Sequence, residues 1–274
     1  MTDLLAGLET KLTDRWLQTR ALPGLLFAGI AGYAGLAGQR HALDPAHAVL
    51  ELQRVVQVLK SLDTTVGGRS GVVFAIAVIL LGASAAGFAA QWLADAVHRA
   101  WTARGPLWWI LRRRRRARNL LARRRPRPPL RYLPARATPI GDRFRLIAQR
   151  VDAQYGLSIA LAWPRLWLLL DETQSARLQT AYGRYRTDLR LTSWGLMYLG
   201  FAAVWWPALL IAMIAAALGY LRGRTSSGVL ADLIEATVDM HQQALAASVG
   251  IDLPHGRITP TEGIQINNIL NKRA

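Results

Sequence analysis

The chain of 274 residues contains no cysteine and only three lysines, although 34 of its residues are basic. The lack of cysteine excludes disulfide bridges, thiolate metal ligands and cysteine nucleophiles. Arginine therefore supplies nearly all of the positive charge, and the net charge of +17 indicates a polyanionic partner. Because a guanidinium group binds phosphate in a bidentate geometry, anionic lipid and nucleic acid are the two candidates.

Charge is also missing locally, because three long stretches contain no Asp, Glu, Lys, Arg or His: residues 21–39, 70–94 and 191–221. A helix needs about 20 apolar residues to cross the hydrocarbon core of a bilayer. The sequence therefore predicts an all-α, polytopic membrane protein rather than a soluble one. Its first two transmembrane helices are expected at 21–39 and 70–94.

The third stretch, residues 191–221, is longer than one span requires and shorter than two comfortable spans. Arginines flank both of its ends, and the positive-inside rule disfavours placing either group outside. A tight hairpin with Trp205, Trp206 and Pro207 at the outer interface satisfies this rule and gives four transmembrane helices. One long tilted or kinked span, which leaves the C-terminus outside, is the alternative.

These spans divide the chain into eight segments. In order they are an amphipathic helix at 1–20, the first span at 21–39, an external helix at 40–69, the second span at 70–94, an arginine-rich cytoplasmic segment at 95–136, a helical cytoplasmic region at 137–190, the hairpin at 191–221, and a C-terminal cytoplasmic helix and tail at 222–274. Residues 95–190 hold 22 of the 34 basic residues, which predicts that this side is cytoplasmic. Both termini are then cytoplasmic, and the expected location is a bacterial inner membrane.

The first predicted span carries small residues at intervals of four, as in Ala28/Gly32 and Ala31/Gly35, and the second carries a run of small residues from Gly82 to Gly87. Such seams let helix backbones approach closely. Helix packing is expected at six glycines: Gly29, Gly32, Gly35, Gly38, Gly82 and Gly87. Packing within one chain is the simpler expectation, and packing between copies is the alternative.

The external helix is expected to begin with Asp44 as its N-cap and Pro45 in its first turn, and to end near Leu62. Its apolar residues fall at heptad positions: Val49, Leu52, Val56 and Leu59. Two heptads are too few for a coiled coil, so the helix is expected to pack on its own protein. An oligomerisation seam is the alternative.

The most distinctive segment follows the second span. Two tryptophans precede a run of arginines, and four prolines between 126 and 134 favour an extended connection after it. Indole rings at headgroup depth and guanidinium groups on phosphates predict contact with anionic lipid. The residues expected to make this contact are Trp108, Trp109, Arg112, Arg113, Arg114, Arg115, Arg116, Arg118, Arg123, Arg124 and Arg125. Nucleic acid is disfavoured, because no base-reading module adjoins these arginines.

The predicted spans contain no ionisable residue, which argues against proton-coupled transport and ion pathways. No histidine or aspartate in a span is available to activate Ser84 or Ser193, so an intramembrane protease is equally disfavoured. The five histidines show no metal-ligand spacing. The sequence therefore predicts no catalytic residue, no metal and no cofactor, and the protein is not expected to be an enzyme.

Two cytoplasmic patterns remain. In 137–190, a helix is expected over Asp142–Gln154 and is closed by Gly156, with Pro164 opening a shorter one. In the C-terminal helix, predicted at Ser226–Val249, three acidic residues recur on one face: Asp232, Glu235 and Asp239. A solvated or arginine-paired face is expected, because cation binding would need a second helix that bears carboxylates.

Residues 138–170, TPIGDRFRLIAQRVDAQYGLSIALAWPRLWLLL, and 235–254, EATVDMHQQALAASVGIDLP, flank the third apolar stretch. Together they resemble an uncharacterised group of bacterial multi-pass membrane proteins. That group combines Thr-Pro-x-Gly, Tyr-Gly-Leu and Trp-Pro-Arg-Leu-Trp motifs with an Asp-x-His helix after a membrane hairpin. The resemblance implies the hairpin but no activity. With the acidic row, it marks candidate functional residues without roles: Trp163, Arg165, Trp167, Asp232, Glu235, Asp239 and His241.

These observations predict an integral membrane scaffold or signalling component that docks on anionic lipid headgroups and on a cytoplasmic protein. The alternative is an oligomeric pore or channel, such as a membrane-disrupting effector. Uncharged spans and a glycine seam suit a ring of helices with a hydrophobic gate. Beyond lipid, the candidate partners are therefore a cytoplasmic protein and further copies of the chain.

Overall fold

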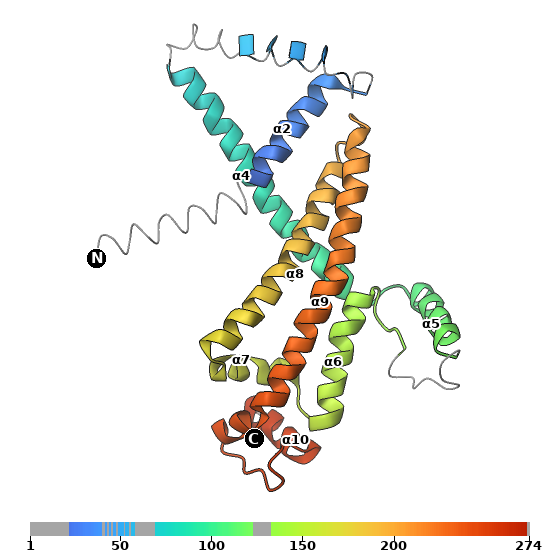
Figure 1. Ribbon diagram of the computed structural model, residues 1–274, viewed down its shortest axis with the longest axis vertical. Helices are drawn as coiled ribbons and strands as arrows, with labels where there is room; N and C mark the ends of the chain where they lie inside the picture. The colour runs from blue at the N-terminus through green and yellow to red at the C-terminus, as the bar shows by residue number, and fades with distance from the viewer. Residues whose placement is uncertain are drawn as a thin grey trace, which may run out of the picture. The chain divides into compact units, whose positions relative to one another are not determined.

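The computed structural model describes residues 22–39, 69–122 and 133–272, together with single residues between 42 and 57 (Figure 1). These residues form α-helices and no strand, which confirms the all-α prediction. The helices are α2 (Leu22–Ala37), α4 (Arg69–Thr102), α5 (Leu107–Ala122), α6 (Pro139–Tyr155), α7 (Ile159–Leu169), α8 (Glu172–Leu199), α9 (Pro207–Ser248) and α10 (Pro260–Leu270). The amphipathic helix predicted at 1–20 lies outside the described residues.

The chain divides into two compact units. The first comprises residues 1–96 and 190–219, and the second comprises residues 97–189 and 220–274. The first unit contains the predicted apolar spans, whereas the second contains the segments predicted to be cytoplasmic. Helices α4, α8 and α9 each contribute residues to both units.

Two helical segments are long and apolar enough to cross a membrane: Ala77–Thr102 within α4, and Pro207–Ser248, which is all of α9. Only 22% of the apolar window of each segment is buried, so neither resembles the core helix of a soluble protein. Length, composition and exposure thus favour a membrane location. Helix α2 contains only a shorter apolar stretch, Pro23–Gly35, and four spans therefore stay a prediction.

The chain reverses within the third apolar stretch. Helix α8 ends at Leu199, and α9 begins at Pro207. A Cβ atom at Gly195 would lie 2.7 Å from the backbone nitrogen of Ala216, so the missing side chain permits close approach of the two helices. Residues 191–221 therefore do not form one continuous helix. Whether they cross a membrane as a hairpin or as one long kinked span stays a prediction.

Helix α2 packs in the first unit through aromatic contacts. The ring of Phe27 lies 5.4 Å from that of Trp194, 5.1 Å from that of Tyr198 and 5.3 Å from that of Phe201. Such edge and tilted pairs stabilise packing beyond the apolar area that they bury. The first apolar stretch thus contacts the α8–α9 turn region as well as α4.

The predicted glycine seam is only partly used within the chain. A Cβ atom at Gly24 would lie 2.2 Å from the carbonyl oxygen of Ala83, so α2 and α4 touch there. Gly87 is buried. The other predicted glycines have no described atom of a neighbouring element within contact distance: Gly29, Gly32, Gly35, Gly38 and Gly82. Packing at these five positions stays a prediction.

The helix predicted to be external has Asp44 at its N-cap, as the sequence predicts. The Oδ1 atom of Asp44 accepts hydrogen bonds from the backbone nitrogens of Ala46 at 3.0 Å and His47 at 3.3 Å, which is the N-cap arrangement. Val49 and Val56 are exposed in the described structure. Leu52 and Leu59, the other two heptad residues, lie outside the described residues.

The core of the second unit forms where α6, α7, α9 and α10 meet. Thr138 caps the N-terminus of α6, and Gly156, at φ 62°, ends the helix in the left-handed conformation that favours glycine. A Cβ atom at Gly263 would lie 1.8 Å from the carbonyl oxygen of Tyr155. Helix α10 therefore sits directly on the end of α6, and only glycine fits at this crossing.

Two details of the second unit differ from the sequence prediction. Pro164 lies inside α7 rather than at its start, because Ser158 takes the N-cap position and the helix continues past the proline. The C-terminal helix does not begin at Ser226, because α9 runs unbroken from Pro207 to Ser248. The boundary at residues 221 and 222 is a change of composition and not a break in the helix.

Candidate functional site

Helix α5 contains the arginine run, and its own side chains tie it to the loop before α6. The indole Nε1 of Trp109 donates to the carbonyl oxygen of Ala137 at 3.0 Å. The Nε of Arg114 donates to the carbonyl oxygen of Pro134 at 2.8 Å. These bonds satisfy loop carbonyls that have no helical partner and fix one side of α5 against the loop.

Arg113 makes the central contact of this attachment. One of its Nη atoms donates to the carbonyl oxygen of Arg136, and the other lies 2.9 Å from Oδ2 of Asp142. The Oδ1 atom of Asp142 accepts hydrogen bonds from the backbone nitrogens of Ala135 at 2.8 Å and Arg136 at 2.9 Å. The Arg113 and Asp142 side chains are 18% and 10% exposed, so water screens this ion pair weakly. Asp142 thus joins the arginine helix, the loop and α6.

Helical periodicity divides the arginine run between two sides of α5. Ile110, Arg113, Arg114 and Ala117 follow the i, i+3, i+4, i+7 spacing and are buried or half-buried. The other arginines are exposed: Arg112, Arg115, Arg116 and Arg118. The apolar residues Leu107 and Trp108, at the start of the helix, are also 71% and 65% exposed. Below, these six residues are called the outer face of α5.

No acidic residue compensates the charge of the outer face from nearby sequence. Residues 96–141 contain neither Asp nor Glu, and Asp142 is already paired with Arg113. A basic cluster without acidic neighbours in the sequence attracts polyanions. Arg113, Arg114 and the Trp109 indole have partners within the chain. Fewer of the residues that the sequence predicts to contact lipid are therefore available for that contact. Arg123, Arg124 and Arg125 lie outside the described residues.

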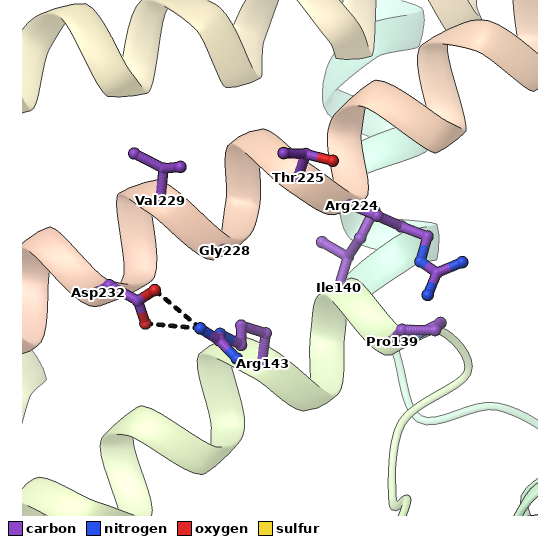
Figure 2. A pocket seen from close by; sticks show the side chains of 8 residues that line it. All are labelled: Pro139, Ile140, Arg143, Arg224, Thr225, Gly228, Val229 and Asp232. Atoms are coloured by element: carbon purple, nitrogen blue, oxygen red, sulfur yellow. Dashed lines mark hydrogen bonds and ion pairs between the residues drawn. The ribbon is translucent and has the colours of Figure 1, made fainter.

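The acidic row on α9 is paired with α6. The Nη2 atom of Arg143 lies 2.7 Å from Oδ1 of Asp232, and dashed lines mark this ion pair in Figure 2. The Nε of Arg150 donates to Oε1 of Glu235 at 2.7 Å. A solvated or arginine-paired face is expected from the sequence, and Asp232 and Glu235 are paired with arginine. In the described part of the chain, no group of three His, Asp or Glu side chains is placed to hold a metal ion.

Asp239, the third acidic residue of the row, has a tyrosine partner. The Tyr155 hydroxyl donates to Oδ1 of Asp239 at 2.8 Å. Burial of the phenol, this hydrogen bond and the nearby charge of Asp239 raise the pKa of Tyr155 to about 12. The pair is a structural link between α6 and α9, because the phenol stays neutral and the carboxylate stays satisfied at neutral pH.

The hollow beside the first ion pair has a volume of about 430 Å³ and lies between the start of α6 and α9. Arg143 and Arg224 are its cationic lining residues. Figure 2 shows Arg143 turned toward Asp232, while the side chain of Arg224 points away from that pair. The two guanidinium groups therefore do not converge on a common point, and the hollow lacks the geometry of an anion site.

A larger cavity of about 620 Å³ lies in the same unit. Five helices line it, through His98, Thr102, Phe144, Trp163, Trp167, Leu178, Gln179, Tyr182, Tyr185, Leu230 and Ile234. The Nδ1 atom of His98 lies 2.9 Å from the hydroxyl oxygen of Tyr185, whose side chain is only 2% exposed. Burial raises the pKa of Tyr185 well above its ordinary value, so the phenol remains protonated.

The candidate residues marked by the sequence do not come together. Trp163 and Trp167 line the aromatic cavity, whereas the acidic row faces α6. Arg165 donates to the carbonyl oxygen of Leu161 in its own helix, and the Nδ1 of His241 lies 3.1 Å from the carbonyl oxygen of Thr237. The candidate residues of the second unit therefore do not form one shared site.

Sequence reasoning missed the partners of the two tryptophans in this cavity. Phe144, Tyr185 and His98 come from three other helices, and no single segment carries them together. One signal was present, because Leu178, Tyr182 and Tyr185 recur at i, i+4 and i+7 on one face of α8. That pattern indicates a buried aromatic face but not what lies opposite it.

Comparison of the chain with protein-family models, with curated proteins and with solved structures gives no match. The resemblance to an uncharacterised bacterial group therefore stays a prediction, and no residue takes a role from a relative. The fold and the site define a helical protein with two candidate membrane-spanning helices, a basic helix that carries tryptophan, and an aromatic cavity.

Proposed function

We propose that this protein is a membrane scaffold whose helix α5 docks on anionic lipid. The observation that carries the proposal is the outer face of α5, where Leu107 and Trp108 are followed by four exposed arginines. Trp109, Arg113 and Arg114 hold the opposite side against the protein. The helix is therefore oriented by its own chain, and its lipid-binding side chains are already directed outward.

The chemistry of this face suits a bilayer interface. An indole ring rests at headgroup depth, where its apolar body and its N–H group are both accommodated. Each arginine near an anionic surface contributes about 1 kcal/mol to binding. The four outer arginines together would contribute roughly 4 kcal/mol if all of them reached phosphate. Nucleic acid binding uses the same charge but gives no role to the exposed Leu107.

The position of α5 in the chain supports docking in cis, on the bilayer that holds the protein. Only residues 103–106 separate the end of the candidate span Ala77–Thr102 from the start of α5. A tether this short gives the docking helix a high effective concentration at the membrane surface. A small binding free energy from each arginine is then sufficient to keep α5 on the lipid surface.

The ion pairs of the second unit support the proposed topology. Arg143 and Arg150, which precede the apolar stretch 191–221, contact Asp232 and Glu235, which follow it. These contacts support placing both flanking segments on the same side of a bilayer, which favours an even number of crossings between them. In the proposal, 191–221 is a transmembrane hairpin, the chain spans a bacterial inner membrane four times, and both termini are cytoplasmic.

The proposal is tested with an environment-sensitive label on α5. Since the chain has no cysteine, Asn119→Cys introduces one thiol for a nitrobenzoxadiazole dye at an exposed position of α5. The protein is reconstituted in nanodiscs of phosphatidylcholine with increasing phosphatidylglycerol. We expect the dye emission to shift to the blue as the anionic fraction rises, and 0.5 M salt to reverse the shift because it screens exposed charge.

Matched charge variants separate docking from net charge. Arg112→Gln with Arg115→Gln should weaken docking by about 2 kcal/mol, roughly a thirtyfold change in the docking equilibrium. Arg177→Gln with Arg257→Gln removes two exposed charges elsewhere in the second unit and should leave the titration unchanged. Equal titrations for the two double variants, or emission that ignores phosphatidylglycerol, would exclude lipid docking by α5.

A second candidate function, an oligomeric pore, is favoured by one observation. Gly29, Gly32 and Gly35 form an exposed face of α2 that meets no described atom of another element. A seam of small residues suits close packing with a second copy. The mass of the complex in nanodiscs and its conductance in planar bilayers distinguish the two functions. A closed ring of four or more copies that Gly32→Leu disrupts would favour the pore, whereas a silent monomer would eliminate it.

A further inference from the structure

The aromatic cavity of the second unit contains no charged side chain of the Asp, Glu, Lys or Arg type among its eleven lining residues. This composition is unusual for its surroundings, because arginine dominates the segments that build the unit. Its volume of about 620 Å³ is in the range of small-molecule sites. A charged ligand would lose its hydration here without gaining an ionic partner, so the composition selects for an uncharged ligand.

The shape of the ligand follows from the aromatic lining. The rings of Trp163 and Trp167 lie 6.2 Å apart on α7, and the rings of Phe144 and Tyr185, on α6 and α8, lie 5.8 Å apart. Both pairs line the cavity. Aromatic side chains recognise flat rings through stacked and edge contacts. The lining therefore favours a ligand built on a planar ring system over a flexible chain alone.

The lining also offers a small number of polar groups. Gln179 and Tyr182 are exposed residues of α8, and a glutamine amide both donates and accepts hydrogen bonds. Thr102 is already engaged, because its hydroxyl donates to the carbonyl oxygen of His98 at 2.9 Å. An apolar site with few polar groups fixes the orientation of a ligand through those groups.

We propose that this cavity binds an uncharged, largely apolar small molecule that contains a flat ring system and at least one hydrogen-bonding oxygen or nitrogen atom. The inference does not depend on lipid docking by α5, because it rests on other residues. Molecules of this chemistry have two sources, the membrane interior and the aqueous cytoplasm. The experiment therefore includes one arm for each source.

The probe is benzophenone, an uncharged ketone with two aromatic rings that forms covalent bonds to nearby C–H groups when it is illuminated. The full chain in nanodiscs is labelled, digested with trypsin and mapped by mass spectrometry. Cleavage after arginine gives three peptides, residues 151–165, 166–177 and 178–184, which contain five of the lining residues: Trp163, Trp167, Leu178, Gln179 and Tyr182. We expect saturable labelling of these peptides. The charged analogue 4-benzoylbenzoate should label them at least tenfold less.

Variants at the cavity distinguish binding there from general partition into the bilayer. Trp167→Ala and Tyr182→Ala each remove an aromatic side chain from the lining, and Tyr182 is 54% exposed, so its loss leaves the core intact. Both should lower labelling of the three peptides at least tenfold. Leu168→Ala is the matched control, because Leu168 adjoins Trp167 but is 83% exposed and does not line the cavity. Its labelling should equal that of the unaltered chain.

The two sources are separated by competition. Nanodiscs that contain an organic extract of host membranes, or buffer that contains the aqueous extract of the same cells, are compared for protection of the three peptides. Protection by either extract supports the proposal and assigns the source. Labelling that stays unchanged in both Trp167→Ala and Tyr182→Ala, equal labelling by the charged analogue, or protection by neither extract would overturn it.

Discussion

Arg113 of α5 contacts Asp142 of α6, with its Nη2 atom 2.9 Å from Oδ2 of the carboxylate. The other carboxylate oxygen of Asp142 accepts hydrogen bonds from two backbone nitrogens of the intervening loop. One acidic side chain thus links the arginine-rich helix to the loop and to α6. The four exposed arginines of α5 face outward because Arg113 and Arg114 are held inward.

Asp142→Asn should release α5 while leaving the loop attached. The amide oxygen can still accept the two backbone N–H groups, but the largely buried Arg113 loses its counter-charge. Removing one partner of such a pair costs about 3 kcal/mol. That loss corresponds to roughly a hundredfold faster hydrogen exchange at the backbone amides of α5, measured by mass spectrometry. Asp252→Asn, at an exposed position, is the control. Equal exchange in the two variants would show that Asp142 does not position α5.

Gly263→Ala should detach α10 from the end of α6. The added Cβ atom would lie 1.8 Å from the carbonyl oxygen of Tyr155, which the packing cannot absorb without moving the helix. Overpacking of this kind costs about 1–3 kcal/mol or more. Gly183→Ala is the matched control, because the same change on α8 meets no described atom and improves helix propensity. Thermal unfolding should show a lower midpoint for the first variant alone, and similar midpoints would contradict the crossing.

The Tyr155–Asp239 pair should make the second unit sensitive to alkali. The pKa of Tyr155 is raised from 10.0 to about 12 in the folded protein, so the folded state holds the phenolic proton more tightly than the unfolded chain. This contribution to stability is complete below about pH 10 and is lost as the pH rises through about 12.

Tyr155→Phe removes both the hydrogen bond and the titration. At neutral pH the variant should be less stable by about 1 kcal/mol, the usual net value of a hydrogen bond. Between pH 10 and 12 its midpoint of thermal unfolding should fall less steeply than that of the unaltered chain. Parallel pH profiles for the two proteins would show that Tyr155 does not cause the alkaline loss.

Much of the architecture follows from local sequence patterns. The chain reverses beside Pro207, α6 ends at Gly156, and the acidic row of α9 meets arginine, because proline, glycine and charge spacing act over a few residues. Pro164 was placed wrongly for a related reason. A proline suits a first helical turn, but the apolar contacts of α7 keep the helix intact on both sides of it.

The features of the site depend on distant residues, and local patterns do not specify them. A run of five arginines repels itself and gives no sign of a helix, but Asp142 and the loop carbonyls near Pro134 stabilise one side of it. The aromatic cavity needs Phe144 of α6 and Trp163 of α7 to face α8. Only the tertiary arrangement brings such residues together.

The depth of α5 in a bilayer is the most direct test of its docking on anionic lipid. A nitroxide label is placed at Leu111→Cys, which lies between Trp108 and the outer arginines, and in a second protein at Gln243→Cys, an exposed position on α9. Both proteins are reconstituted in bilayers that contain phosphatidylglycerol, and collision of the label with oxygen and with a water-soluble nickel chelate is measured. If α5 docks on the bilayer, the label at 111 meets oxygen more often than nickel, while the label at 243 shows the opposite preference. Equal access of nickel to both positions would contradict docking of α5 on the membrane.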